Sequence, residues 1–305
     1  MQLALRLLPP QIYGDGHAYA VPLTGSGTIE SINSLTRDDL VSFHEKWLRP
    51  DNATIFVVGD ATMDEIKPML EAAFGRWSAP STPLPQKNVA HVDRPSSGKV
   101  ILVDKPGSPQ SLILAAHVAP PSNSPDSVAI NAMNDILGGQ FSARVNMNLR
   151  EDKGWAYGAY TFLQGAKGQR PFMVYAPVQT DKTTQSLQEL LKELNGYKTT
   201  KPATPAEVER TILNNVRSLP GSFETSGDVL GSLPASARYG RPWDYPATLK
   251  DKYESLTVAD VKAAADKVVH PESLIWVIVG DREKIEAGVR SLNLGPIEIK
   301  NINEL

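Results

Sequence analysis

The chain has 305 residues, a length that favours about two domains. Its 41% of apolar and 21% of charged residues are typical of a folded globular protein and exclude a disordered, fibrous or coiled-coil chain. The net charge of −3 shows no basic excess, so nucleic acid is not an expected partner. With no cysteine, disulfides, a thiolate zinc site and a cysteine nucleophile are excluded.

The chain opens with an apolar stretch that Arg6 interrupts and that Pro9 and Pro10 end. This pattern is not that of a secretory signal and is typical of the last turns of an amphipathic helix. A start in mid-helix is expected of a piece cut from a longer protein. No apolar run approaches the roughly 20 residues that a membrane-spanning helix needs.

After this opening stretch, two further helices and a strand are predicted before residue 80. Thr36 is a good N-cap with Asp39 three positions later, and the helix behind it ends before Pro50. Residues 53–59 are short, apolar and β-branched, which predicts a buried strand. A second helix follows, with an apolar stripe of Met63, Ile66, Leu70 and Phe74.

A proline-rich stretch then marks a stiff linker at residues 81–98. We therefore expect a partial first domain at residues 1–80 and a complete second domain at residues 99–305. Two strands, at 99–104 and 111–117, are joined through Pro106-Gly107 and are predicted to form a hairpin.

Helices and strands continue to alternate in the second domain. A helix is predicted at 127–137, ended by Gly138-Gly139, and Phe141, Val145 and Leu149 form the stripe of the next one. Further elements are predicted as strands at 156–163 and 171–178 and as helices at 181–194 and 205–217. This order predicts an α+β fold, a mainly antiparallel sheet with helices packed on one face.

An internal repeat relates the two ends of the chain. Residues 34–60 match residues 255–281 at a constant offset of 221 without a gap, and nine of the 27 positions are identical. Such agreement favours two homologous domains in tandem over chance. Because the first copy lies so close to Met1, the first domain is expected to lack its N-terminal part.

No local metal or nucleotide motif is present. No two of the five histidines lie within 25 residues of each other, and none belongs to a His-Glu-x-x-His motif or its inverse. A zinc site assembled from distant histidines is left as a minor alternative. No P-loop and no Gly-x-Ser-x-Gly elbow occurs either.

One segment, residues 149–157, contains two candidate functional residues. Arg150 ends a helix, Tyr157 starts the next strand, and a turn through Gly154 brings them together. Both donate hydrogen bonds, so the pair can hold a peptide carbonyl and stabilise negative charge growing on it. Because side chains alternate along a strand, Tyr157 and Phe162 are expected on opposite faces of the sheet, with Phe162 beneath the helices. A salt-bridged arginine and a half-buried tyrosine are the structural alternative, which the residues alone favour.

Residues 138–157 carry a Gly-Gly, a Phe-Ser, a Leu-Arg-Glu and a Gly-Trp-Ala-Tyr. This series resembles the second-domain signature of the pitrilysin or insulinase-like metallopeptidases, family M16. Residues 17–25, 49–53 and 57–60 resemble the late part of that family's first domain. The resemblance covers nearly the whole chain and agrees with the repeat.

The resemblance implies a clamshell zinc endopeptidase that closes over extended peptides. Its zinc ligands, His-x-x-Glu-His and a later Glu, would lie upstream of the part present here. We therefore expect zinc in an active parent, no metal-binding or catalytic residue in this chain, and no cleavage by it alone. Arg150 and Tyr157 match the family's Arg and Tyr that reach the substrate carbonyl.

Two functions remain open at this point. The chain is either the substrate-gripping part of a zinc endopeptidase, with a peptide as its partner, or a non-catalytic M16-like half that completes a chamber. A small-molecule binding protein has no support beyond the missing catalytic motif. Expected partners are the missing N-terminal part, another M16-like half or a second copy, and residues 1–8 are expected to dock on the incomplete first sheet. A bacterial periplasmic location is expected from the resemblance alone.

Overall fold

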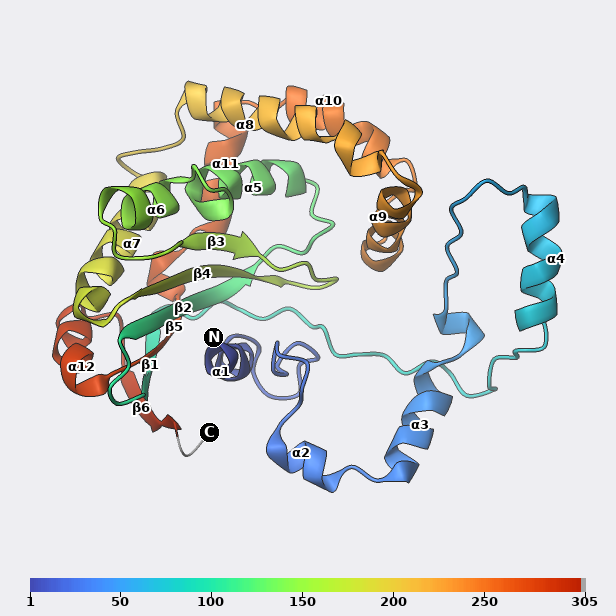
Figure 1. Cartoon of the computed structure of the whole chain (residues 1–305), viewed down its shortest axis with the longest axis horizontal. Coiled ribbons are helices and arrows are strands. Elements are labelled where there is room, and N and C mark those ends of the chain that lie inside the picture. The colour runs from blue at the N-terminus through green and yellow to red at the C-terminus, as the bar shows by residue number, and fades with distance from the viewer. Residues whose placement is uncertain (303–305) are drawn as a thin grey trace.

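In the computed structural model, which describes residues 1–302, a six-stranded sheet forms the centre of the molecule (Figure 1). The strand order is β3-β4-β2-β5-β1-β6. Neighbours from β3 to β5 pair antiparallel, and β1 pairs parallel with β5 and β6. The predicted α+β fold with a mainly antiparallel sheet is confirmed. The strands are β1 (Lys99–Asp104), β2 (Gln110–Ala119), β3 (Tyr160–Leu163), β4 (Arg170–Gln179), β5 (Ile275–Gly280) and β6 (Ile297–Asn301).

Most of the helices after β2 cover one face of this sheet (Figure 1). Alternate strand residues point to them: Val100 and Leu102 lie on the helical face, and Ile101 and Val103 on the other. Because both faces are covered, the central strands are mainly apolar. The helices are α5 (Ser127–Asn134), α6 (Arg144–Asn146), α7 (Thr183–Lys198), α8 (Pro205–Ser218), α9 (Ser226–Tyr239), α10 (Leu249–Glu254), α11 (Val258–Val268) and α12 (Arg282–Ser291).

The predicted hairpin of the first two strands is wrong. Strand β5 lies between β1 and β2, and its Val279 pairs with Val103 on one side and with Leu112 on the other. All six residues of β5 are buried. A strand this apolar is stabilised at the centre of the sheet, where both faces and both edges are covered.

Helix α1 (Gln2–Tyr13) covers the opposite face of the sheet. It buries Ala4 and Leu8 against strand residues such as Val277. The expected docking of residues 1–8 on a sheet formed by residues 1–80 is therefore wrong, because they pack on the six-stranded sheet of β1–β6.

Helix α1 also runs through the two prolines that were expected to end it. Proline has no N–H, so the carbonyl of Leu5 loses the partner that residue 9 would supply in a regular helix. The backbone N–H of Leu23 donates to that carbonyl at 3.0 Å instead. The tertiary contact thus compensates for the missing helical bond.

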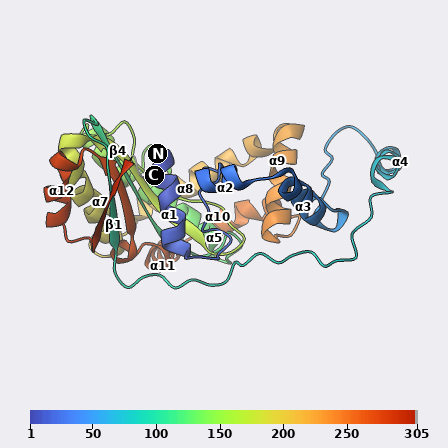
Figure 2. The same ribbon diagram turned by 90° about the horizontal axis from the view of Figure 1, so that it is seen from below.

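Residues 24–80 form an arm that extends away from the sheet (Figures 1 and 2). It carries α2 (Ile29–Ser34), α3 (Arg37–Trp47) and α4 (Met63–Phe74). The strand predicted at 53–59 is not formed, since no other strand of the described chain lies beside it to pair its backbone. The division into a partial domain, a linker and a complete domain stays a prediction.

Candidate functional site

Arg150 lies in the π-helical turn Met147–Asp152, which continues the short helix α6. Its guanidinium carbon is 4.6 Å from the ring centroid of Phe141 and 5.1 Å from that of Tyr157. Its Nε also lies 3.2 Å from a carboxylate oxygen of Glu151. The arginine is therefore held between two aromatic rings, an arrangement that stabilises and orients a cation.

Tyr157 is 86% exposed. Gly154 turns the chain with φ of 66°, and Ala156 forms an isolated bridge with Val178 before the regular strand starts. The strand predicted from residue 156 begins only at Tyr160. Tyr157 thus lies in the segment that leads into β3, with its phenol in solvent.

The prediction of which side chains of β3 point towards the helices is wrong. Thr161 is buried on the helical side, where its hydroxyl donates to Oδ1 of Asn134 in α5 at 2.9 Å. Phe162 packs in the cluster that contains α1. The polar residue finds its partner under the helices, and the aromatic residue fills the face that α1 covers. Tyr157 is exposed because it precedes the strand, not because of alternation along it.

Phe141 is the residue of this group that sequence reasoning missed. It was expected on the apolar stripe of a helix, but the helix begins only at Arg144. Phe141 remains 55% exposed and lies against Arg150. The Gly138-Gly139 pair was the available signal, because it ends the preceding helical stretch and leaves residues 140–143 outside regular structure.

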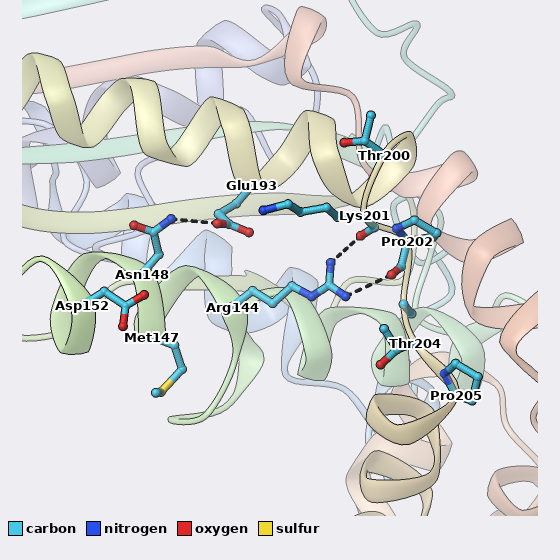
Figure 3. A pocket seen from close by; sticks show the side chains of 11 residues that line it. Arg144, Met147, Asn148, Asp152, Glu193, Thr200, Lys201, Pro202, Thr204 and Pro205 are labelled. Atoms are coloured by element: carbon cyan, nitrogen blue, oxygen red, sulfur yellow. Dashed lines mark hydrogen bonds between the residues drawn. The ribbon is translucent and has the colours of Figure 1, made fainter.

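A pocket of about 680 Å³ lies next to this segment (Figure 3). Asn148 on its wall donates at 2.8 Å to Glu189 and at 2.7 Å to Glu193, both from α7. Arg150 and Tyr157 are not among its lining residues. Because its amide and carboxylates bond to one another, this wall is a structural contact between α7 and the turn that carries Arg150. The shared cleft expected for Arg150 and Tyr157 stays a prediction.

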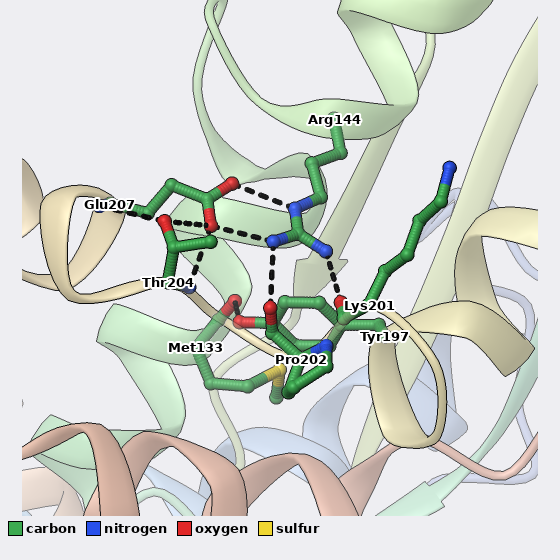
Figure 4. Close-up of polar contacts among 7 residues, drawn as sticks. All are labelled: Met133, Arg144, Tyr197, Lys201, Pro202, Thr204 and Glu207. Carbon is green, nitrogen blue, oxygen red and sulfur yellow. Dashed lines mark hydrogen bonds and ion pairs between the residues drawn. The ribbon is translucent and has the colours of Figure 1, made fainter.

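Arg144 lies on the pocket wall between Asn148 and the loop that carries Lys201 and Pro202 (Figure 3), and Figure 4 shows its polar contacts. Its Nε and Nη2 donate to the two carboxylate oxygens of Glu207 at 2.7 and 2.6 Å, and further N–H groups donate to the carbonyls of Lys201 and Pro202. Glu207 also accepts from the backbone N–H of Thr204 at 2.8 Å, which caps α8. The ion pair ties α6 to the start of α8.

This ion pair predicts acid sensitivity. Burial would raise the pKa of Glu207, but hydrogen bonds from Arg144 and Thr204 outweigh it and lower that pKa to about 2. A carboxylate with a depressed pKa stabilises the fold above its unfolded pKa of about 4.3, and this contribution is lost as the pH falls towards 2. Urea unfolding between pH 2 and 6 should show a weaker pH dependence in Glu207→Gln than in the wild type. Glu209→Gln, at an exposed position of α8, should keep the wild-type dependence; equal curves for all three proteins would contradict the prediction.

The described residues do not fit a zinc ion. No group of three or more histidine, cysteine, aspartate or glutamate side chains within residues 1–302 is arranged to hold a metal. Two distant histidines do meet, since the backbone N–H of His270 donates to Nε2 of His117 at 3.3 Å. Burial lowers the pKa of His117 to about 3, so this ring is neutral and part of the core.

No helix in the described part of the chain is both long and apolar enough to cross a membrane.

Comparisons with known proteins agree on one family. The family model described as the peptidase M16 inactive domain matches residues 34–215, more than half of the chain. An uncharacterized zinc protease of Mycobacterium leprae is 27% identical over 273 residues, which cover 85% of this chain but only 57% of that protein.

Two solved structures share the fold. A peptidase M16 inactive domain from Pseudomonas fluorescens has a TM-score of 0.77 and 24% identity, over 91% of this chain and 64% of that one. The first half of the periplasmic protease PqqL from Escherichia coli has a TM-score of 0.65 and 15% identity, over 87% and 60%.

Proposed function

Since the chain belongs to the M16 peptidase family, in the part described as the inactive domain, we propose that it forms the substrate-gripping wall of a peptidase chamber. Hydrolysis is left to a zinc-bearing part that the described residues do not contain. The name of the M. leprae relative, a zinc protease, supports zinc in the complete protein. The observation that carries the proposal is the exposed phenol of Tyr157 beside the guanidinium of Arg150.

The position of Arg150 and Tyr157, close to the start of β3, supports the same role. Strand β3 is the terminal strand of the described sheet and pairs with β4 alone. The carbonyl of Thr161 already accepts from the side-chain amide of Asn134 at 3.1 Å, and the N–H of Ala159 donates to Asn146 at 3.1 Å. A bound peptide would therefore lie beside the segment that leads into β3 rather than pair along the strand. Arg150 and Tyr157, just before this edge, would donate to a peptide carbonyl and stabilise the negative charge that develops on it.

Peptide binding without cleavage tests this role. The chain alone should contain no tightly held zinc after dialysis against a weak chelator, and it should not cleave an unstructured peptide. The same peptide should slow amide hydrogen exchange in residues 150–163 and leave exchange in α12 unchanged. One equivalent of zinc with turnover, or no protection at residues 150–163, would contradict the proposal.

A non-catalytic partner half is the second candidate, and the arm favours it. Leu40, Phe43 and Met63 are 61%, 59% and 72% exposed, so the apolar faces of α3 and α4 are not packed within the described chain. Such faces are typical of surfaces that another protein covers. We propose that a zinc-bearing or second M16-like half covers them, with a second copy of this chain as a substitute in its absence.

Light scattering tests whether the apolar surface of the arm mediates association. The mass of the purified chain should rise with concentration, and the double variant Leu40→Ser, Phe43→Ser should reduce this rise by removing apolar area from α3. Glu45→Ser, at an exposed position of the same helix, should leave the rise unchanged. A wild-type chain that is monomeric at every concentration would exclude self-association through the arm.

We also propose a periplasmic location. Its support is the similar E. coli structure, which is part of a periplasmic protease. Fractionation of cells that express the complete protein tests the proposal, and recovery with cytoplasmic markers would contradict it.

A further inference from the structure

Two arginines that form no ion pair among the described residues lie close together where β4 begins and α9 ends. Arg170 is the first residue of β4 and is only 5% exposed. Its Nε donates to the carbonyl of Pro120 at 3.0 Å. Arg241 follows Gly240, the left-handed C-cap of α9, and its Nη2 donates to the carbonyl of Ser122. Both guanidinium groups are therefore anchored to one short loop, two residues apart.

Each guanidinium group keeps a buried N–H group that has no acceptor in the described part of the chain. These groups are Nη2 of Arg170 and Nε of Arg241. Neither arginine takes part in any of the ion pairs found within residues 1–302. A buried donor without an acceptor, on a charged group, is unfavourable unless something else supplies the acceptor.

The nearby carboxylate does not supply it. Asp126 acts on Arg170 through its charge, but its oxygens bond to Nζ of Lys267 at 2.6 Å and to the hydroxyl of Ser124. Burial and the charge of Arg241 both lower the pKa of Arg170. The two guanidinium groups thus repel each other, and the carboxylate beside them is already neutralised.

Aromatic rings hold Arg241 in this position. Its guanidinium carbon lies 4.5 Å from the ring centroid of Tyr245 and 5.4 Å from that of Tyr239. Unlike Arg170, Arg241 is only partly buried as a residue, so a small solute can approach its side chain from solvent, although its Nε itself is buried. The site therefore has one buried cation, one accessible cation and a fixed geometry.

We propose that Arg170 and Arg241 bind a small oxyanion that carries at least two oxygens, of the phosphate or carboxylate class. One such anion accepts from the free N–H group of each arginine and cancels their mutual repulsion. Guanidinium groups are suited to this because their N–H groups match phosphate and carboxylate oxygens in geometry as well as in charge.

Inorganic phosphate is the first probe. Calorimetric titration of the full chain at constant ionic strength, with chloride as the balancing anion, should show saturable binding, and phosphate should raise the thermal midpoint. Arg241→Gln should weaken binding by about tenfold or more, since it removes a charge-assisted hydrogen bond. Arg238→Gln, which removes the same charge from an exposed position on α9, should leave binding unchanged. Arg241 is the primary target because Arg170 is buried and its loss could unfold the protein.

Each outcome of the titration decides the proposal. A tetrapeptide with a free C-terminal carboxylate, compared with its amide, distinguishes the source: binding of the free acid alone identifies a peptide terminus, and binding of phosphate alone identifies a phosphate ligand. Both results support the site if Arg241→Gln weakens the binding by about tenfold or more. No saturable binding of either probe, or equal losses in Arg238→Gln and Arg241→Gln, would overturn it.

Discussion

Tyr157→Phe should keep the fold and lower kcat by about 10²–10³ when the chain is assayed together with its zinc-bearing part. The variant removes only the phenol hydroxyl, one of the two donors that we propose for the peptide carbonyl. The ring stays next to Arg150, at 5.1 Å in the wild type, so the packing of the site is preserved. Steady-state kinetics on an unstructured peptide, with circular dichroism as the check of folding, measures the effect.

Arg150→Ala should lower kcat to a similar extent and also raise KM, because the guanidinium group holds the peptide before and during reaction. Arg238→Ala is the matched control, since it removes an exposed arginine from α9, outside the proposed site. If Tyr157→Phe and Arg150→Ala both cleave at the rate of the wild type, the pair is structural and the second candidate function is favoured.

Leu8→Ala should destabilise the chain by about 2.7–5 kcal/mol, the range found for cavities left by buried leucines. Leu8 is fully buried between α1 and the sheet face that includes Ile101 and Leu114. The lost side chain leaves a space that the rigid sheet cannot fill. Urea unfolding followed by circular dichroism measures the change in the free energy of unfolding.

Met63→Ala is the control for Leu8→Ala. Met63 is 72% exposed on α4, so its truncation should change the free energy of unfolding by no more than about 0.5 kcal/mol. A loss below about 1 kcal/mol for Leu8→Ala would mean that α1 is not held on the sheet in solution.

The candidate site was partly predictable from the sequence. The motif placed Arg150 and Tyr157 on either side of a glycine turn, and the structure brings them together. Phe141 was not predictable as a member of the group, because an apolar residue at helical spacing fits a core stripe equally well. Its exposure depends on where the helix starts, and that start is at Arg144. The functional role of the pair stays a prediction.

The two copies of the internal repeat separate local from tertiary effects. In the first copy, Thr36 and Asp39 form a capping box at the start of α3, with 2.6 Å between the hydroxyl and the carboxylate. In the second copy, Thr257 and Asp260 form the same box at the start of α11, also at 2.6 Å. Residues three positions apart at a helix N-terminus satisfy each other without outside help, so the sequence alone determined these helix starts.

The strands of the two repeats differ, although their sequences are alike. Residues 275–280 form the central strand β5, buried between β1 and β2, whereas residues 54–59 form no strand and Ile55 and Val57 are about half exposed. A strand satisfies its backbone groups only through neighbouring strands, which can come from distant parts of the chain. The sequence by itself therefore determined where these two helices start, their caps and the strand-forming character of both segments. Only the tertiary structure decided which segment became a strand, where β5 was inserted, and that α1 covers the second face of the sheet.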